Sequence, residues 1–197
     1  ILMDGDGEDR PIEIKELINK ISKNPEKSAV AKRIKRSEGQ IFQFMYQMHK
    51  LITLLFTGKK INFGNYSCLT KKDIKILSDK ASLWSSYSGT VKKNLKEFNE
   101  IESMRGIRYF GPSKMSLYNL GIHSLSIIAV FKYQVFLRTS IALIALAFLN
   151  NFFGIQFVIF QILLITFNLL IFVVSRREDE KALFASHQNM LNKIEIT

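Results

Sequence analysis

The chain has 197 residues, of which 28 are lysine or arginine and 17 are aspartate or glutamate, so its formal charge is +11. A chain of this length forms one or two domains, and its basic excess favours anionic partners such as lipid headgroups or phosphorylated molecules. Nucleic acid is the weaker interpretation and we predict no such partner, because the sequence has no basic helix with base-reading spacing and no zinc ligands. The single cysteine, Cys68, excludes an intrachain disulfide.

The first eleven residues join an apolar run to a dense acidic cluster. Residues 1–3 have strand character, and carboxylates follow at positions 4, 6, 8 and 9 before Pro11 opens a helix-like segment. An Asp-x-Asp pair (Asp4, Asp6) at the carboxyl end of a buried strand, with Glu8 two residues on, is typical of enzymes that hold a divalent metal against a nucleotide diphosphate. Hard cations prefer carboxylate oxygens, and the metal then neutralises phosphate charge. Taken alone, these residues fit a solvated acidic turn equally well.

The character of Ile1 also bears on what precedes it. Ile1 resembles a residue in the middle of a strand, and a strand that ends in such an acidic motif normally follows earlier strands of a sheet. We therefore expect the chain to be a fragment, or a processed product, that lacks an N-terminal half.

The next fifty residues alternate between helix and strand patterns. Residues 11–22 are predicted to be helical, because apolar residues recur at positions 14, 17, 18 and 21. Residues 28–32 form a short strand candidate. A basic loop over 32–36 follows, in which Arg33 and Arg36 are either a solvated face or phosphate ligands. Residues 38–56 are predicted to form a long helix. Most of its apolar stripe is expected in the core: Ile41, Phe44, Met45, Met48, Leu51, Ile52 and Leu55.

The stretch from 62 to 112 has weaker signals. Residues 62–67 are predicted as a loop leading to a brief strand over 67–69, and residues 71–77 as a short helix. Residues 82–98 are ambiguous and favour a helix with a break near Gly89. Residues 102–110 are predicted as a strand that ends at Gly111-Pro112.

The last third of the chain has the composition of a membrane protein. Residues 115–138 are predicted to form an amphipathic helix along the bilayer surface, with a buried core helix as the alternative. The 37 residues 139–175 contain no charge, which is enough for two short passes with a turn near Asn150, Asn151 and Gly154. Since basic residues tend to remain cytosolic, Arg138 and the pair Arg176-Arg177 place both ends of this hairpin in the cytosol. Residues 176–197 are a polar cytosolic tail.

A second motif stands just before the membrane segment. Residues 108–114 read Arg-Tyr-Phe-Gly-Pro-Ser-Lys, an Arg-x-x-Gly-x-Ser-Lys loop. Seven features follow one another along the chain: the acidic strand end, the proline, the basic loop, the aromatic-serine segment at 65–67, this Arg-x-x-Gly-x-Ser-Lys loop, an amphipathic helix and a transmembrane hairpin. Together they resemble the membrane-bound family 2 glycosyltransferases of the polyprenyl-phosphate type, the group of dolichyl-phosphate mannose synthase and bactoprenol glucosyltransferase.

The resemblance implies a fold and a function. The fold would be α/β, with residues 1–114 as the C-terminal half of a GT-A type mixed-sheet domain, 115–138 as an interfacial helix, 139–175 as a transmembrane hairpin and 176–197 as the tail. The function would be metal-dependent, inverting transfer of a sugar from a nucleotide sugar to a polyprenyl phosphate. The protein would be integral to the membrane, with its catalytic domain on the cytosolic face; a bacterial inner membrane is favoured over the endoplasmic reticulum. A fragment without the first half of the donor site is expected to be inactive alone.

The resemblance also assigns roles to residues. Asp4 and Asp6 would bind the donor, Asp6 and Glu8 would hold Mg²⁺ or Mn²⁺, and Asp6 and Arg108 would be catalytic. The acceptor phosphate would be bound by five residues: Arg33, Arg36, Arg108, Ser113 and Lys114. A lipid phosphate is already anionic at neutral pH, so the chemistry requires alignment and electrostatic stabilisation and no strong base.

Two other functions are compatible with parts of the sequence. A two-span membrane adaptor or effector with a basic cytosolic domain would use Arg108 and Lys114 only to bind lipid headgroups, but it would have no use for the acidic cluster. A membrane anchor for nucleic acid is supported by the charge alone. A homo-oligomer stays open, because short membrane hairpins often associate with neighbours.

Overall fold

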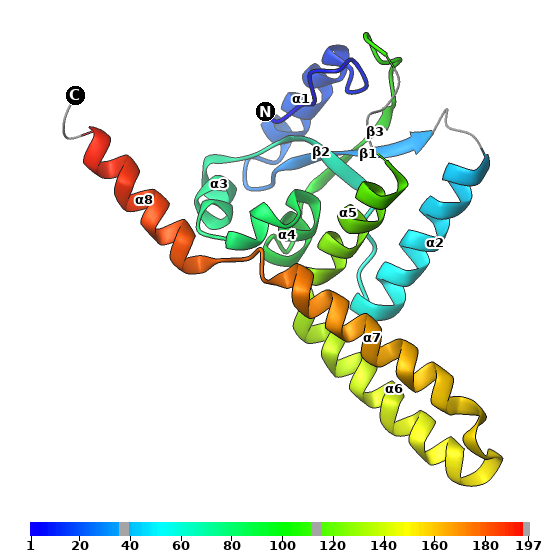
Figure 1. The fold of residues 1–197 in the computed structure, drawn as a ribbon. Coiled ribbons are helices and arrows are strands. Elements are labelled where there is room, and N and C mark those ends of the chain that lie inside the picture. Colours follow the sequence, from blue (N-terminus) through cyan, green and yellow to red (C-terminus); the bar gives the residue numbers. More distant parts are fainter. Residues whose placement is uncertain (36–39, 112–115, 195–197) are drawn as a thin grey trace.

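The computed structural model describes residues 1–35, 40–111 and 116–194 and has a mixed α/β fold, which confirms the predicted class (Figure 1). Within these residues the sheet has three strands, β1 (Ala29–Lys35), β2 (Phe63–Cys68) and β3 (Asn99–Met104), in the order β2-β1-β3. The central strand β1 pairs antiparallel with β2 and parallel with β3. The sheet is therefore mixed.

Helices cover both faces of this sheet. A turn of 3-10 helix (Pro11–Glu13) leads into α1 (Ile14–Lys23), whose Leu17 is fully buried with Ala29 and Ala31 of β1. Val30 points to the opposite face, as alternation along a strand requires, and packs with residues of α3 (Lys71–Ser78) and α4 (Tyr87–Asn94). Figure 1 shows α1 on one side of the strands and α3 and α4 on the other.

The predicted helices over 11–22 and 71–77 are confirmed, but several boundaries in this domain were predicted wrongly. The expected basic loop over 32–36 is strand as far as Lys35, and the expected loop over 62–67 is almost entirely β2. Both stretches are polar, yet they pair with each other, so tertiary pairing overrides their composition. The helix break predicted near Gly89 is absent, because Gly89 lies inside α4 and its N–H donates to the capping hydroxyl of Ser86. A short 3-10 helix (Ala81–Trp84) precedes that cap.

The opening segment is not the buried strand that the sequence predicts. Leu2 forms a single antiparallel bridge with Ser67 at the outer edge of β2, with N···O distances of 2.9 and 3.1 Å. The side chains of Ile1, Leu2 and Met3 are 59%, 39% and 40% exposed. The bridge nevertheless fixes the point at which the acidic residues leave the edge of the sheet.

The long helix predicted over 38–56 is present as α2 (Gln40–Thr57), but most of the described residues of its apolar stripe are not in the core. Among the described side chains of α2 the buried ones are Thr53 and Thr57, and Ile52 and Phe56 pack beside them against the hairpin. The Phe56 ring lies 4.4 Å from that of Phe167. By contrast, four residues of the stripe are well exposed: Phe44, Met48, Leu51 and Leu55.

The C-terminal end of α2 is joined to the predicted hairpin through an arginine. Gly58 ends the helix with φ +72°, and a Cβ there would lie 2.5 Å from the Arg138 guanidinium. Arg138 donates to the Leu55 carbonyl at 3.0 Å, where a cation is favourable because helix C-termini carry partial negative charge. Glycine at position 58 therefore allows both the turn and this contact.

The single amphipathic helix predicted over 115–138 is two helices. α5 (Leu117–Ala129) ends before Val130 and Phe131, both fully buried, and α6 (Lys132–Phe153) then begins. The apolar residues around this junction are protein core, in agreement with the alternative interpretation of a core helix. The Lys93 ammonium of α4 donates to the Val130 carbonyl at 2.7 Å, so the junction is bonded to the sheet domain.

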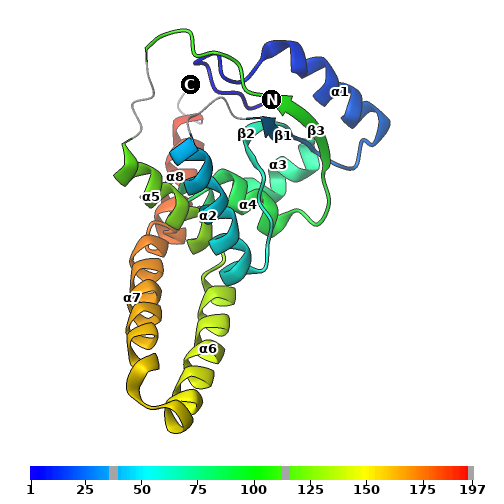
Figure 2. The same cartoon turned by 90° about the vertical axis from the view of Figure 1, so that its right-hand side faces the viewer.

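The predicted hairpin is formed by α6 and α7 (Val158–Ser175), joined at Gly154 and a 3-10 turn (Ile155–Phe157). Two helical stretches, 132–153 and 155–189, are long and apolar enough to cross a membrane, with mean hydropathies of 1.6 and 2.7. In both views the hairpin projects from the rest of the chain (Figure 2). Asn150 and Asn151 were predicted to be in the turn but belong to α6.

Polar contacts connect the two helices of the hairpin. The Thr139 hydroxyl donates to the Asn168 side-chain oxygen at 2.9 Å, and the Asn150 amide donates to Gln161 at 3.3 Å. At the base, Lys132 pairs with the mostly buried Glu178 at 3.0 Å. The tail then forms α8 (Glu180–Ile194).

Candidate functional site

The acidic residues form a closed loop between the Leu2 bridge and the first helical turn. The Asp4 N–H donates to the Asp9 carboxylate at 3.0 Å, and the Glu8 N–H donates to that of Asp6 at 3.0 Å. Gly7 has φ +92°, a conformation that favours glycine. These contacts curl residues 4–9, here called the acidic loop, into a compact turn.

A second segment, residues 105–111, lies directly on the acidic loop after the chain leaves β3. Its backbone is bonded to the loop twice: the Gly106 N–H donates to the Glu8 carbonyl at 2.8 Å and the Tyr109 N–H donates to the Asp6 carbonyl at 2.9 Å. The Tyr109 ring covers Gly7 so closely that a Cβ on Gly7 would lie 2.8 Å from ring carbons. We call residues 105–111 the arginine segment.

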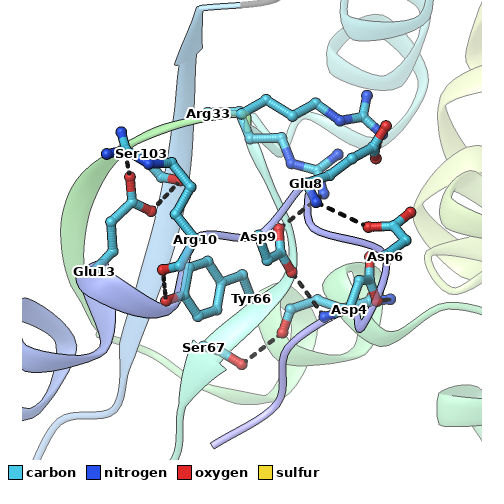
Figure 3. A network of polar contacts seen from close by, with 12 residues as sticks. Asp4, Asp6, Glu8, Asp9, Arg10, Glu13, Arg33, Tyr66, Ser67 and Ser103 are labelled. Carbon is cyan, nitrogen blue, oxygen red and sulfur yellow. Dashed lines mark hydrogen bonds and ion pairs between the residues drawn. The ribbon is translucent and has the colours of Figure 1, made fainter. Parts of the chain in front are cut away.

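Two arginines of this segment pair with two carboxylates of the loop. Arg108 lies 3.1 Å from an Asp6 oxygen and 3.2 Å from a Glu8 oxygen, and Arg105 pairs with the other oxygen of Glu8. The four side chains are between 14% and 35% exposed. Charge-assisted bonds of this kind are stronger than neutral ones, and the partial burial limits screening by solvent. The close-up in Figure 3 shows where Asp6 and Glu8 lie on the loop.

A buried carboxylate supports the loop from behind. Asp9 is only 4% exposed and lies 3.7 Å from the Arg33 guanidinium of β1, in addition to accepting the Asp4 N–H. Burial raises the pKa of Asp9, and the Asp4 hydrogen bond and the Arg33 charge oppose that shift. Asp9 therefore connects both ends of the acidic loop with the central strand.

Two further residues fasten the end of the loop to the sheet (Figure 3). The Tyr66 hydroxyl donates to the Arg10 carbonyl at 2.7 Å, and burial, with the nearby negative charges, raises the pKa of Tyr66 to about 12. The Glu13 carboxylate accepts from the Ser103 hydroxyl at 2.7 Å and from the Met104 N–H at 3.2 Å. Since Met104 is the last residue of β3, Glu13 also sets where the arginine segment begins.

The structure brings some of the predicted site residues together and separates others. Asp6, Glu8 and Arg108 form one cluster. The Asp4 carboxylate accepts from Asn65 of β2 at 3.5 Å, while Arg33 contacts Asp9. Three predicted phosphate ligands lie outside the described residues: Arg36, Ser113 and Lys114.

Several residues of the cluster were not predicted. Arg105 was assigned to the interior of a strand over 102–110, where alternate side chains would have pointed away from the loop; the earlier end of β3 frees it to pair with Glu8. Asp9 was counted in the acidic run without a role. The proximity of Glu13 to the end of β3 follows only from the three-dimensional fold.

The carboxylates of the acidic loop were predicted to hold Mg²⁺ or Mn²⁺. In the part of the chain that the structure describes, no three His, Cys, Asp or Glu side chains lie close enough to hold a metal ion. Asp6 and Glu8 could supply two carboxylate ligands, but both now pair with arginine. The residues fit a metal only if further oxygens come from a bound ligand, as diphosphate oxygens often do for Mg²⁺.

The charges of the cluster could be exchanged for those of a bound ligand. Two guanidinium groups and two carboxylates balance each other in a partly buried site, so none of these charges lacks a partner. A bound anion would draw on the arginines and a bound cation on the carboxylates. A ligand that combines a diphosphate with a divalent cation could therefore replace the internal ion pairs without a net change of charge.

Comparison of the chain with protein-family models, with curated proteins and with solved structures gave no match.

Proposed function

We propose that this chain belongs to an enzyme that transfers a sugar from a nucleotide-diphosphate donor to a polyprenyl phosphate at the cytosolic face of a membrane. The observation that carries the proposal is the pairing of Arg108 with both Asp6 and Glu8. The two motifs on which the resemblance depends are about a hundred residues apart in sequence, yet they meet at one site. A pair of membrane-length helices follows that site in the same chain.

The fold supports the same proposal. A GT-A type domain has a mixed sheet between helices, and here the antiparallel strand β2 stands between the Leu2 bridge and β1, with helices on both faces. The acidic loop leaves the sheet at that edge. This arrangement supports the proposed GT-A assignment.

The chemistry is a displacement at the anomeric carbon of the sugar. A phosphate oxygen of the lipid forms the new bond to that carbon while the bond to the nucleotide diphosphate breaks and the diphosphate leaves with the electron pair. The configuration inverts. Arg108 would neutralise phosphate charge through its bidentate geometry, and Asp6 would orient the donor. No proton has to be removed from the nucleophile.

A divalent cation enters the proposal together with the donor. Asp6 and Glu8 would hold it, and when bound it would neutralise the diphosphate. Because releasing Arg108 leaves Asp6 without its arginine and Glu8 with Arg105 alone, we expect nucleotide diphosphate and Mg²⁺ to bind more tightly together than either does alone.

The test measures transfer of radiolabelled sugar into the lipid phase, by membranes that contain the natural protein carrying this chain. A panel of nucleotide sugars, polyprenyl phosphate and Mg²⁺ identifies the donor. Arg108→Ala should lower turnover by about 10²-fold or more, the scale for loss of one stabilising group. Arg108→Lys should recover only part of the lost turnover, because an ammonium cannot donate the two parallel hydrogen bonds of a guanidinium.

Arg176→Ala is the matched control, because Arg176 is an exposed arginine at the base of the hairpin. It should leave turnover nearly unchanged. Normal turnover in Arg108→Ala, with weaker binding to anionic vesicles, would reject the catalytic role and favour a basic patch that only binds lipid headgroups.

A further inference from the structure

Helix α2 exposes a narrow, continuous apolar stripe along one side. Phe44, Met48, Leu51 and Leu55 recur at spacings of four, three and four residues, so they lie above one another on one side of the helix. Their exposed fractions are 66%, 39%, 58% and 62%. We call these four residues the outer stripe.

The outer stripe is separate from the face that α2 uses for packing. The packing face contains Ile52, Thr53, Phe56 and Thr57, which meet the hairpin and α5. Gln43 and Gln47 are exposed on a third, polar side. A helix with one face in the protein core, one apolar face outside and one polar face has a second apolar neighbour beyond its own domain.

The position of α2 identifies that neighbour. Its C-terminal end is bonded to Arg138 of α6, and directly after Arg138 the hairpin exposes apolar side chains such as Ile141 and Ile144, at 60% and 71%. Lys59 and Lys60, both exposed, stand beside that end. Arginine and lysine collect at the depth of the lipid headgroups. The base of the hairpin and the end of α2 would therefore both lie at headgroup depth.

From this level α2 extends sideways. In Figure 1 it runs away from the base of the hairpin and does not follow α6 toward the tip. A helix that starts at headgroup level, runs across the hairpin direction and exposes an apolar stripe has the properties of an interfacial helix. The sequence placed such a helix at 115–138, where the structure has a buried junction instead.

We propose that the outer stripe of α2 is a lipid-binding surface that inserts into the boundary between headgroups and acyl chains, in the leaflet that surrounds the base of the hairpin. This inference depends on the membrane location in the proposed function and not on the transfer reaction. It adds a second membrane contact, made by the sheet domain itself, and so fixes the orientation of the domain on the bilayer.

The experiment uses tryptophan as a depth probe. Trp84, the only tryptophan of the chain, is first replaced in a Trp84→Phe variant. Single tryptophans are then introduced at exposed positions, where they disturb packing little: Leu51→Trp in the outer stripe, Ile144→Trp in the hairpin, and Ile12→Trp, 70% exposed on the sheet domain, as the control. Each full-length variant is reconstituted into phosphatidylcholine vesicles with bromine placed either near the headgroups or near the bilayer centre.

We expect Leu51→Trp to show blue-shifted emission that is quenched most by bromine near the headgroups. Ile144→Trp should be quenched more by bromine near the bilayer centre, and Ile12→Trp by neither lipid. The proposal is overturned if Leu51→Trp is unquenched while Ile144→Trp is quenched. An unshifted spectrum would then mean that water covers the stripe, and a blue-shifted one that protein covers it, for example a second copy of the chain.

These results also separate this proposal from the wider one. If Ile144→Trp is not quenched either, the membrane hairpin itself fails, and with it the membrane location. If Ile144→Trp behaves as expected and sugar transfer is absent, the lipid contact of α2 still stands on its own measurement.

Discussion

At the scale of single residues, the site depends on the buried carboxylate of Asp9, which lies close to Arg33. Asp9 costs free energy when ionised in its buried position, and the hydrogen bond from Asp4 and the charge of Arg33 repay only part of that cost, because the pKa of Asp9 stays raised. Buried charged groups of this kind are often retained for the geometry they enforce. Here the enforced geometry is the curl of the acidic loop.

The raised pKa of Asp9 predicts a pH dependence of stability. The folded chain holds the Asp9 proton more tightly than the unfolded chain, so this stability contribution is complete below the ordinary value of 3.8 and is lost as pH rises through the raised value. Asp9→Asn cannot titrate but keeps an oxygen that accepts the Asp4 N–H. Relative to wild type, the variant should therefore gain stability as pH rises from below 3.8 to neutral. Thermal unfolding in detergent, followed by near-ultraviolet circular dichroism, measures this difference; parallel pH curves would contradict it.

Gly7 provides a second prediction at this scale. Gly7→Ala should cost about 1–3 kcal/mol of stability, because it places a side chain at φ +92° and drives a Cβ into the Tyr109 ring. Displacing Tyr109 also moves Arg108, so sugar transfer should fall. Gly5→Ala is the control, since a Cβ there meets nothing within 4 Å and its φ is not positive. Equal losses in the two variants would show that the Tyr109 contact has no role.

At the scale of elements, the sequence correctly predicts helices and strands that depend on local pattern. It fails for boundaries that depend on contacts with residues far away in the chain. Strong periodicity or composition marks α1, α2 as a helix and the hairpin with its Gly154 turn, and all three are confirmed, as is α3 with its weaker signal. The end of β3 has no local signal; it is set by Glu13, ninety-one residues before Met104 in the chain. Three predicted members of the site could be found from motif order, but Arg105 could not, since its role depends on that strand end.

The apolar stripe of α2 shows the same limit in another form. Periodicity correctly predicts which side of a helix is apolar, but not whether protein or another apolar phase covers it. The packing face of α2 is partly threonine: the Thr53 hydroxyl lies 3.5 Å from His49 Nδ1, and the Thr57 hydroxyl donates to the Thr53 carbonyl at 2.6 Å. Choosing the core-facing side of α2 by its apolar residues was therefore largely wrong.

The hairpin helices offer a prediction about polar contacts in an apolar medium. The Thr139 hydroxyl reaches Asn168 across the hairpin but also lies 2.9 Å from the Val135 carbonyl of its own helix. Because its one proton has a local alternative, the coupling in a double-mutant cycle of Thr139→Val and Asn168→Leu should be about 0.6 kcal/mol, the average for such bonds in membranes. Reversible unfolding in mixed micelles measures it. A coupling of about 2 kcal/mol would show that the interhelical bond dominates.

At the scale of the whole molecule, the basic residues at both ends of the hairpin predict how the chain is oriented. Arg138 is bonded to the end of α2 and Arg176-Arg177 directly follow α7, so both lie at the base of the hairpin, and the tip carries no charge. Basic flanks stay on the cytosolic side. The sheet domain should therefore be cytosolic and only the tip should face outward.

Cysteine labelling tests this orientation. In a Cys68→Ser background, Ile155→Cys at the tip, where the residue is 82% exposed, should react with a membrane-impermeant maleimide added to intact cells. Lys15→Cys on α1, also exposed, should react only after the membrane is opened. Labelling of Lys15→Cys in intact cells, or protection of Ile155→Cys, would contradict the predicted topology.

The bond between Lys93 and the Val130 carbonyl has a consequence for how the protein responds to its surroundings. It fastens the sheet domain to the buried junction at which α6 begins. Under the proposed function, the height of Arg108 above the lipid would then follow how deeply the hairpin lies in the bilayer. A thicker or thinner bilayer would raise or lower the ion-pair cluster relative to the acceptor phosphate, and membrane thickness would become a control on the rate of transfer.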